Sequence, residues 1–266
     1  MLKKRILTAT ILIALFVFLL FKLNPQLFCL LTSLVVIGCG WEWSQFLGFK
    51  TFLPRLGYCL IFIIMMFLAF WLPLVNVLYV AVACWIIMLF FVIFYPKGSF
   101  FWGKNKGLLG VMGLIVIIPA WLAINLIRNA ENGILILLFL FILIWSADSF
   151  AYFAGKKWGK HKLIPAVSPG KSWEGLIGAI IGAGFVILLT LVVTKVEFAT
   201  WPLAFLIGWV TVLFSIVGDL VESMCKRNVG LKDSSQILPG HGGLLDRLDS
   251  LMAAAPVFAL GAYWLG

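Results

Sequence analysis

Long apolar segments recur along almost the whole chain, and this recurrence constrains the fold more than any other feature. A helix that crosses a bilayer needs about 20 mostly apolar residues. Of the 266 residues, 64% are hydrophobic and 11% are charged, whereas soluble domains carry roughly 25% charged residues. The sequence therefore predicts an all-α polytopic integral membrane protein with about nine transmembrane helices, at residues 6–23, 26–48, 54–73, 75–95, 108–127, 134–153, 174–194, 199–222 and 250–265.

The distribution of basic residues predicts how these spans are oriented. With nine spans and a cytoplasmic N-terminus, all Lys and Arg residues except Lys22, Arg128 and Lys195 fall on the cytoplasmic side, as the positive-inside rule requires. An eight-span alternative, which merges the third and fourth segments around Pro73, spoils this asymmetry. We therefore expect the C-terminus on the opposite side. The same rule accounts for the net charge of +10, so we expect no nucleic-acid partner.

Acidic residues are concentrated in the C-terminal part of the chain. Only Glu131 and Glu197 fall in predicted outward loops, and the first 107 residues contain a single acid, Glu42. We therefore expect any chemistry to face the cytoplasm. The predicted organisation is an N-terminal transmembrane scaffold, 1–107, and a C-terminal catalytic region, 108–266, with cytoplasmic loops 154–173 and 223–249.

The predicted eighth span ends in a polar stripe. Its members recur at spacings of three and four and so share one helix face; they are Asp219, Glu222, Ser223 and Lys226. A helix end that neutralises itself is one interpretation. However, Asp219 lies inside the apolar run, where an unpaired carboxylate costs about 2.5–3.5 kcal/mol on insertion scales. A bound cation would offset that cost, and we favour this interpretation.

A glycine-rich loop leads into the last predicted span. Pro239–Gly243 holds three glycines, so it cannot be helical, and its backbone tolerates the close approach of a phosphate; an ordinary turn is the alternative. His241 fits a phosphate ligand, a proton shuttle and a capping residue equally well. Asp246 and Asp249 follow at a helix N-terminus, where capping alone also explains acidic residues, above all Asp249.

Asp219 and Asp246 belong to different predicted helices, and we expect them to converge on one ion. Hard oxygen ligands without His or Cys indicate Mg²⁺ rather than zinc.

A second cluster precedes the seventh predicted span. Five lysines in residues 154–173 are explained by topology or by attraction to anionic lipids. Within it, Ser168–Ser172 resembles the end of a P-loop, but the strand and the upstream glycine are missing, so we reject a Walker motif. We expect a phosphate contact at the following helix N-terminus instead.

Two further features indicate structural roles. Gly178 and Gly182 form a GxxxG pattern, which is typical of close helix packing. Glu42 lies between Trp41 and Trp43, and we favour interfacial anchoring over a functional role for it.

The polar residues of the C-terminal part resemble the signature of the phosphatidate cytidylyltransferases, the CDP-diacylglycerol synthases. The matching residues are Ser223, Lys226, Arg227, Lys232, Asp233, Ser235, Leu238, Pro239, His241, Gly242, Gly243, Leu244, Asp246, Arg247, Leu248 and Asp249. Cys225 departs from the signature, which usually has a larger apolar residue there. Upstream, Asp148, Tyr152, Gly155, Lys156 and Gly159, with the Ser168–Gly175 segment, also resemble family motifs.

This resemblance implies an enzyme that converts CTP and phosphatidate into CDP-diacylglycerol and pyrophosphate, with Mg²⁺ required. It also implies a polytopic protein of the bacterial inner membrane, commonly a homodimer, that acts in phospholipid biosynthesis. We then expect Asp219 and Asp246 to hold the metal and to form the catalytic set with Lys226 and Asp249. The expected substrate-binding residues are Lys171, Ser172, Ser223, Arg227, Lys232, Asp233, His241, Gly242, Gly243 and Arg247.

Two alternatives remain open at this stage. In a transporter or channel, Asp148 and Asp219 would line a path, although the acids gather at one membrane face rather than at mid-depth. A CTP-using lipid kinase, which acts on a polyprenol or isoprenoid alcohol, is chemically closer.

Overall fold

Long helices make up most of the computed structural model, which describes residues 2–237 and 242–265. They are α1 (Leu2–Lys22), α2 (Pro25–Trp43), α3 (Phe52–Ala69), α4 (Leu74–Ile93), α6 (Lys106–Asn129), α7 (Gly133–Trp158), α8 (Trp173–Thr194), α9 (Trp201–Asn228) and α10 (Leu245–Leu265). Two short helices, α5 (Ser99–Trp102) and η1 (Phe198–Thr200), lie in connections. Each predicted apolar segment falls on one of the long helices.

Seven helices in the described part of the chain are long and apolar enough to cross a membrane. They are α2, α3, α4, α6, α7, α8 and the segment Phe198–Asn228, which joins η1 to α9. Helix α1 contributes only a shorter apolar stretch, Ile13–Lys22, and α10 is not among the seven. The polytopic membrane fold is therefore confirmed, while the count of nine spans and the sides of the two termini stay predictions.

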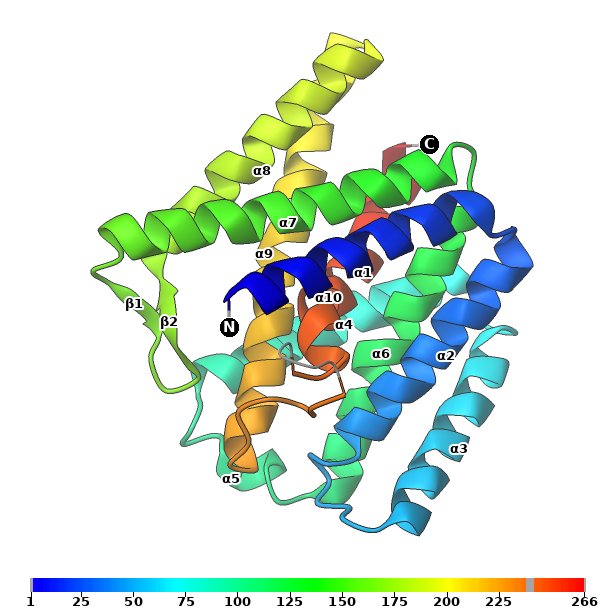
Figure 1. Ribbon diagram of the computed structural model, residues 1–266, viewed down its shortest axis with the longest axis vertical. Coiled ribbons are helices and arrows are strands. Elements are labelled where there is room, and N and C mark those ends of the chain that lie inside the picture. Colours follow the sequence, from blue (N-terminus) through cyan, green and yellow to red (C-terminus); the bar gives the residue numbers. More distant parts are fainter. Residues whose placement is uncertain (1, 238–241, 266) are drawn as a thin grey trace.

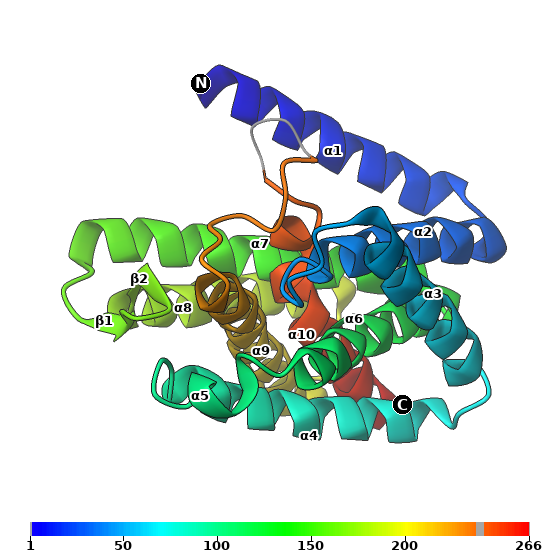
Figure 2. The same cartoon turned by 90° about the horizontal axis from the view of Figure 1, so that it is seen from below.

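Helix α10 occupies the centre of the bundle. It packs against α9, α6, α4 and α7, and Figure 2 shows it surrounded by these helices. Three consecutive alanines, Ala253, Ala254 and Ala255, are fully buried on it. Because alanine is small, neighbouring helices can approach from several sides. The start of α10 lies beside the end of α9 (Figure 1).

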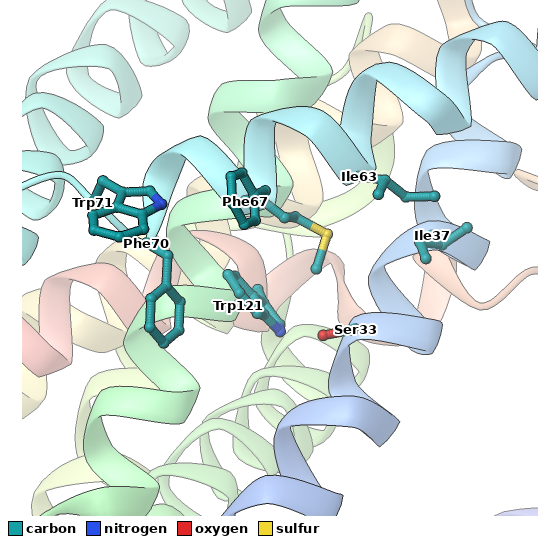
Figure 3. Close-up of a pocket in the computed structure, with 8 residues that line it drawn as sticks. Ser33, Ile37, Ile63, Phe67, Phe70, Trp71 and Trp121 are labelled. Carbon is teal, nitrogen blue, oxygen red and sulfur yellow. The ribbon is translucent and has the colours of Figure 1, made fainter.

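The outer surface of the bundle is apolar. Exposed side chains on α8 include Ile181 and Phe185, and this helix extends away from the bundle beside α9 (Figure 1). An apolar pocket of about 300 Å³ lies between α2, α3 and α6, with Phe67, Trp71 and Trp121 in its wall (Figure 3). None of its lining residues is charged, so this pocket suits lipid chains and not a nucleotide.

The predicted cytoplasmic loops are shorter than expected. Helix α7 continues to Trp158 and α9 to Asn228, because basic residues in their last turns interact favourably with the helix dipoles. Between α7 and α8 the chain forms an antiparallel hairpin of β1 (Lys162–Ile164) and β2 (Ser168–Ser172), which the all-α prediction missed. The hairpin leads directly into α8, where the Ser172 hydroxyl accepts a hydrogen bond from the Gly175 N–H at 3.1 Å.

The GxxxG pattern mediates packing between α7 and α8, as predicted. A Cβ atom on Gly178 would lie 2.5 Å from the Cβ of Ala154, and one on Gly182 would lie 2.5 Å from the Phe150 ring. Both distances are shorter than real contacts, so only glycine lets the helices approach this closely.

We expect Gly178→Ala to lower the stability of the protein by about 1–3 kcal/mol, because the added methyl group overpacks this interface. Gly184→Ala is the matched control on the same helix, since its Cβ would meet the Trp209 ring at an ordinary distance of 3.5 Å. The control should be neutral or stabilise by up to about 1 kcal/mol through helix propensity. Thermal unfolding in detergent compares the two, and equal melting temperatures would contradict this assignment.

Candidate active site

The polar stripe of α9 faces α10. Gly218 permits the close approach of the two helices, because a Cβ there would overlap the carbonyl oxygen of Asp249. One turn on, the Ser223 hydroxyl donates to Asp219 Oδ1 at 3.1 Å, and Lys226 forms an ion pair with Glu222. The prediction that these residues share one helix face is therefore confirmed.

Lys226 joins the two helices. Its Nζ lies 2.6 Å from Asp246 Oδ1 on α10 and also contacts Glu222 on α9. All three side chains are less than a tenth exposed. Because buried charges lose their hydration, this arrangement is stable only while the cation and the carboxylates stay together.

Asp246 is held by the connection that precedes α10. Its Oδ2 accepts hydrogen bonds from the Gly243 N–H at 2.8 Å and the Ser234 N–H at 2.9 Å. The Ser234 hydroxyl lies 3.0 Å from the same oxygen, and its single proton is shared with the carboxylate of Glu42. Burial raises the pKa of Asp246, but the hydrogen bonds from Lys226 and these backbone groups outweigh it and lower the pKa to about 2. Asp246 is therefore a carboxylate at neutral pH, as a metal or cation ligand must be.

Two glycines of the predicted loop are required by this geometry. Gly242 adopts a φ of +82°, in the left-handed region, and a Cβ there would lie 2.7 Å from Asp246 Oδ2. A Cβ on Gly243 would overlap the Ser234 hydroxyl. Both positions therefore favour glycine, because a side chain there would collide with Asp246 or with the serine that contacts it. His241 lies outside the described residues.

The hairpin brings the second predicted cluster to the same place. Lys171 on β2 places its Nζ 2.7 Å from Asp219 Oδ2, and both side chains are partly exposed. Asp148 on α7 lies within electrostatic range of Lys171 and Asp219. Segments from α7, the hairpin, α9 and α10 therefore meet in one polar cluster.

Asp249 belongs to this cluster and does not cap the helix start. Helix α10 begins at Leu245, and the carboxylate of Asp249 accepts a hydrogen bond from the Ser250 N–H at 2.7 Å. It also lies within electrostatic range of Asp219 and Glu222. The surroundings of Asp249 therefore favour a role in the polar cluster over helix capping.

The remaining predicted substrate-binding residues differ in their surroundings. Arg227 links α9 to its neighbours, because its guanidinium donates to the carbonyls of Leu231 at 3.1 Å and Val167 at 3.4 Å. The exposed set consists of Lys232, Asp233 and Arg247. The Ser172 hydroxyl caps the N-terminus of α8 by accepting the hydrogen bond from the Gly175 N–H.

The donor chemistry of the cluster fits a hard divalent cation. Its acids offer only carboxylate oxygens, and the two carboxylate oxygens of buried Glu222 have no hydrogen-bond donor apart from the ion pair with Lys226. Asp219 and Asp246, however, are each paired with a lysine. Within the described residues, no three His, Cys, Asp or Glu side chains already form a metal-binding group. Metal binding by Asp219 and Asp246 thus stays a prediction.

The prediction that Glu42 is an interfacial anchor is wrong. Its side chain is fully buried at the end of α2 and accepts hydrogen bonds from Ser234, Ser235, Leu244 and Leu245. The carboxylate can be buried because these four donors replace the water that would otherwise hydrate it. One signal was available in the sequence, because a lone acid in an apolar segment favours a functional role.

We expect Lys226→Met to destabilise the protein by about 3–5 kcal/mol, because it leaves Glu222 and Asp246 buried without a cation. Lys171→Met is the matched control, and it should cost about 1 kcal/mol or less, since its pair with Asp219 is partly exposed. Thermal unfolding of both variants in detergent with EDTA measures the difference. A larger loss for Lys171→Met would contradict this ranking.

Comparisons with known proteins agree with this arrangement. The profile of the cytidylyltransferase family matches residues 3–264. A Pseudomonas aeruginosa protein named phosphatidate cytidylyltransferase is 41% identical over 263 residues, 97% of this chain and 96% of that protein. A Haemophilus influenzae protein of the same name is 39% identical over 288 residues, 97% of this chain and 98% of that protein.

A third relative, from Escherichia coli, is named uncharacterized protein YnbB and is 34% identical over 244 residues, 85% of this chain and 80% of that protein. The family profile covers nearly all of the described helices, including both sides of the polar cluster. The chain therefore belongs to the cytidylyltransferase family of nucleotidyltransferases, together with the relatives named phosphatidate cytidylyltransferase.

Proposed function

We propose that the protein transfers the cytidylyl group of CTP to phosphatidate and so forms CDP-diacylglycerol and pyrophosphate for phospholipid biosynthesis. The observation that carries this proposal is the polar cluster itself, in which carboxylates and lysines gather at one end of membrane-spanning helices. Such a position gives a membrane-bound lipid and a soluble nucleotide access to the same residues. The names of the relatives support these two substrates.

The chemical step in this proposal is an in-line displacement. An oxygen of the phosphatidate phosphate attacks the α-phosphorus of CTP and forms a new P–O bond, while the bond from that phosphorus to the oxygen bridging the β-phosphate breaks and pyrophosphate leaves. The attacking phosphate is already anionic at pH 7, so no strong general base is required. The protein then contributes mainly positioning and charge neutralisation, as in other phosphoryl transfers.

The basic residues would neutralise the phosphates. Lys232 and Arg247 are exposed and free to approach the triphosphate or the lipid phosphate, and Arg227 lies nearby on α9. Lys171 and Lys226 are already paired with carboxylates, so phosphate binding would draw them away only as another cation takes their place beside those carboxylates.

The charge balance of the cluster supports a metal requirement. Asp148, Asp219, Glu222, Asp246 and Asp249 share the cluster with two lysines, Lys171 and Lys226. Because carboxylates outnumber the contacting lysines, a further cation would reduce their mutual repulsion. Asp219 and Asp246 would hold Mg²⁺, which supplies charge neutralisation at the reacting phosphates, with Glu222 and Asp249 as orienting groups.

The cellular setting belongs to the same proposal. The asymmetry of basic residues supports an active site on the cytoplasmic side and the N-terminus in the cytoplasm. The bacterial relatives support location in the inner membrane. We also propose a homodimer, because the resemblance to the phosphatidate cytidylyltransferases implies one.

Purified protein in mixed micelles should release pyrophosphate when CTP, phosphatidate and Mg²⁺ are supplied together. Omission of phosphatidate or addition of EDTA should abolish the release, because nucleophile and metal are both needed. A CTP-using lipid kinase would yield CDP and a phosphorylated alcohol instead, and a transporter would release nothing. Either result would contradict the proposed reaction.

We expect Asp246→Asn to lower kcat for CDP-lipid formation by about 100-fold or more, because a neutral amide binds a divalent cation much less tightly than a carboxylate and leaves Lys226 without one charged partner. Glu197→Gln is the control, since Glu197 is an exposed acid just before η1 and takes no part in the cluster. Activity is measured with radiolabelled CTP on protein that elutes as a single species. Full activity of Asp246→Asn would overturn the metal assignment.

A further inference from the structure

We propose that Glu42 is a positioning residue, which fixes the connection between α9 and α10 and, through Ser234, sets the orientation of Asp246. Glu42 lies in α2, within residues 1–107, which the sequence predicts to be a scaffold. This inference rests on the proposed function, because the consequence of orienting Asp246 is measured on that reaction. It assigns to the N-terminal half a specific part in the active site.

The contacts of Glu42 clamp both ends of the connection. At the end that leaves α9, Ser234 Oγ donates to Oε2 at 2.9 Å and Ser235 Oγ donates to Oε1 at 2.6 Å. At the end that enters α10, the backbone N–H groups of Leu244 and Leu245 donate to Oε1 at 2.9 Å and Oε2 at 2.7 Å. Each carboxylate oxygen therefore holds one donor from each end.

Burial makes this clamp specific. Glu42 is 0% exposed, and in the described part of the chain its partners are neutral donors rather than a Lys or Arg in an ion pair. A buried carboxylate without a paired cation requires such donors to replace its hydration. The carboxylate and the connection thus depend on each other. Displacement of either leaves polar groups unpaired.

Ser234 carries the effect to the active site. Its hydroxyl lies 2.9 Å from Glu42 Oε2 and 3.0 Å from Asp246 Oδ2, and its N–H donates to the same Asp246 oxygen at 2.9 Å. Asp246 in turn contacts Lys226 through its other oxygen. A continuous chain of contacts therefore runs from α2 to the catalytic helices. Glu42 acts through Ser234 and does not touch the reacting groups itself.

The geometry distinguishes a carboxylate from an amide at this position. All four groups that contact Glu42 are placed as donors, two on each oxygen. In Glu42→Gln one of these oxygens becomes an NH₂ group, which faces a backbone N–H that has no acceptor. The two serine hydroxyls can rotate to adapt, but Leu244 and Leu245 N–H cannot. The variant should therefore loosen the connection without changing side-chain volume.

The test compares Glu42→Gln with the wild type in the full-length protein. We expect kcat to fall roughly 10–100-fold and the Mg²⁺ concentration for half-maximal activity to rise by a similar factor, as for groups that orient metal ligands. A merely structural role lowers the active fraction and hence the apparent kcat, but it leaves the Mg²⁺ dependence unchanged. Without substrates, Mg²⁺ should raise the melting temperature less than in the wild type. Hydrogen exchange at Leu244 and Leu245 should become faster.

Gln45→Met is the matched control from the same end of the protein. Gln45 Nε2 donates to the Ser234 carbonyl at 2.9 Å, so this variant removes a contact to the same segment without touching Glu42 or Asp246. Its Mg²⁺ dependence should stay that of the wild type. An unchanged Mg²⁺ dependence in Glu42→Gln, or an equal shift in Gln45→Met, would overturn the positioning role.

A serine pair keeps the inference testable if Glu42→Gln does not fold. Ser234→Ala breaks the path to Asp246, whereas Ser235→Ala removes a contact of Glu42 that does not continue to Asp246. Only Ser234→Ala should raise the Mg²⁺ requirement, and equal effects of the two would contradict the inference. If the wild type forms no CDP-lipid, the proposed function is wrong. If the wild type and the variants are equally active with the same Mg²⁺ dependence, only the positioning role of Glu42 is wrong.

Discussion

The buried ion pairs of Lys226 with Glu222 and Asp246 organise the catalytic half of the molecule. An ammonium group and two carboxylates out of water are costly to desolvate, and they repay that cost only at contact distance. The contact requires the end of α9 to lie against the start of α10. Gly218 on α9 and the small residue Ala253 on α10 permit this approach. Helix packing and charge pairing therefore depend on each other.

The described residues on both sides of the gap between α9 and α10 are placed by Asp246. Its second oxygen accepts hydrogen bonds from the N–H groups of Ser234 and Gly243, so both of these residues lie against the carboxylate. This arrangement leaves no space for a side chain at Gly242 or Gly243. Glycine here serves the orientation of an acid, in addition to any approach of a phosphate to the backbone.

Features that depend on neighbouring residues were predictable from the sequence. The apolar segments predict the long helices, and the spacing of Asp219, Glu222 and Lys226 predicts their common face, because both patterns repeat within one helix. The GxxxG pattern likewise predicts the contact of α8, although it does not identify α7 as the partner. The signature residues include Asp246 and Asp249, which both lie in the polar cluster, but the signature does not indicate which lysine each acid contacts.

Features that depend on distant partners were not predictable in this way. Lys171 and Asp219 are neighbours only because the hairpin folds against α9, and the hairpin is too short to show a strand period. Glu42 is separated from Ser234 by 192 residues, so nothing close to it in sequence indicates its donors.

The separation of Glu42 from its donors in the sequence explains why residues 1–107 were predicted to be only a scaffold. An acid in an apolar helix is costly unless the fold supplies donors, and here the donors come from the catalytic connection. The carboxylate of Glu42 and the ends of that connection therefore stabilise each other. The lone acid of the first 107 residues is thus an indication that the two halves form a single active unit.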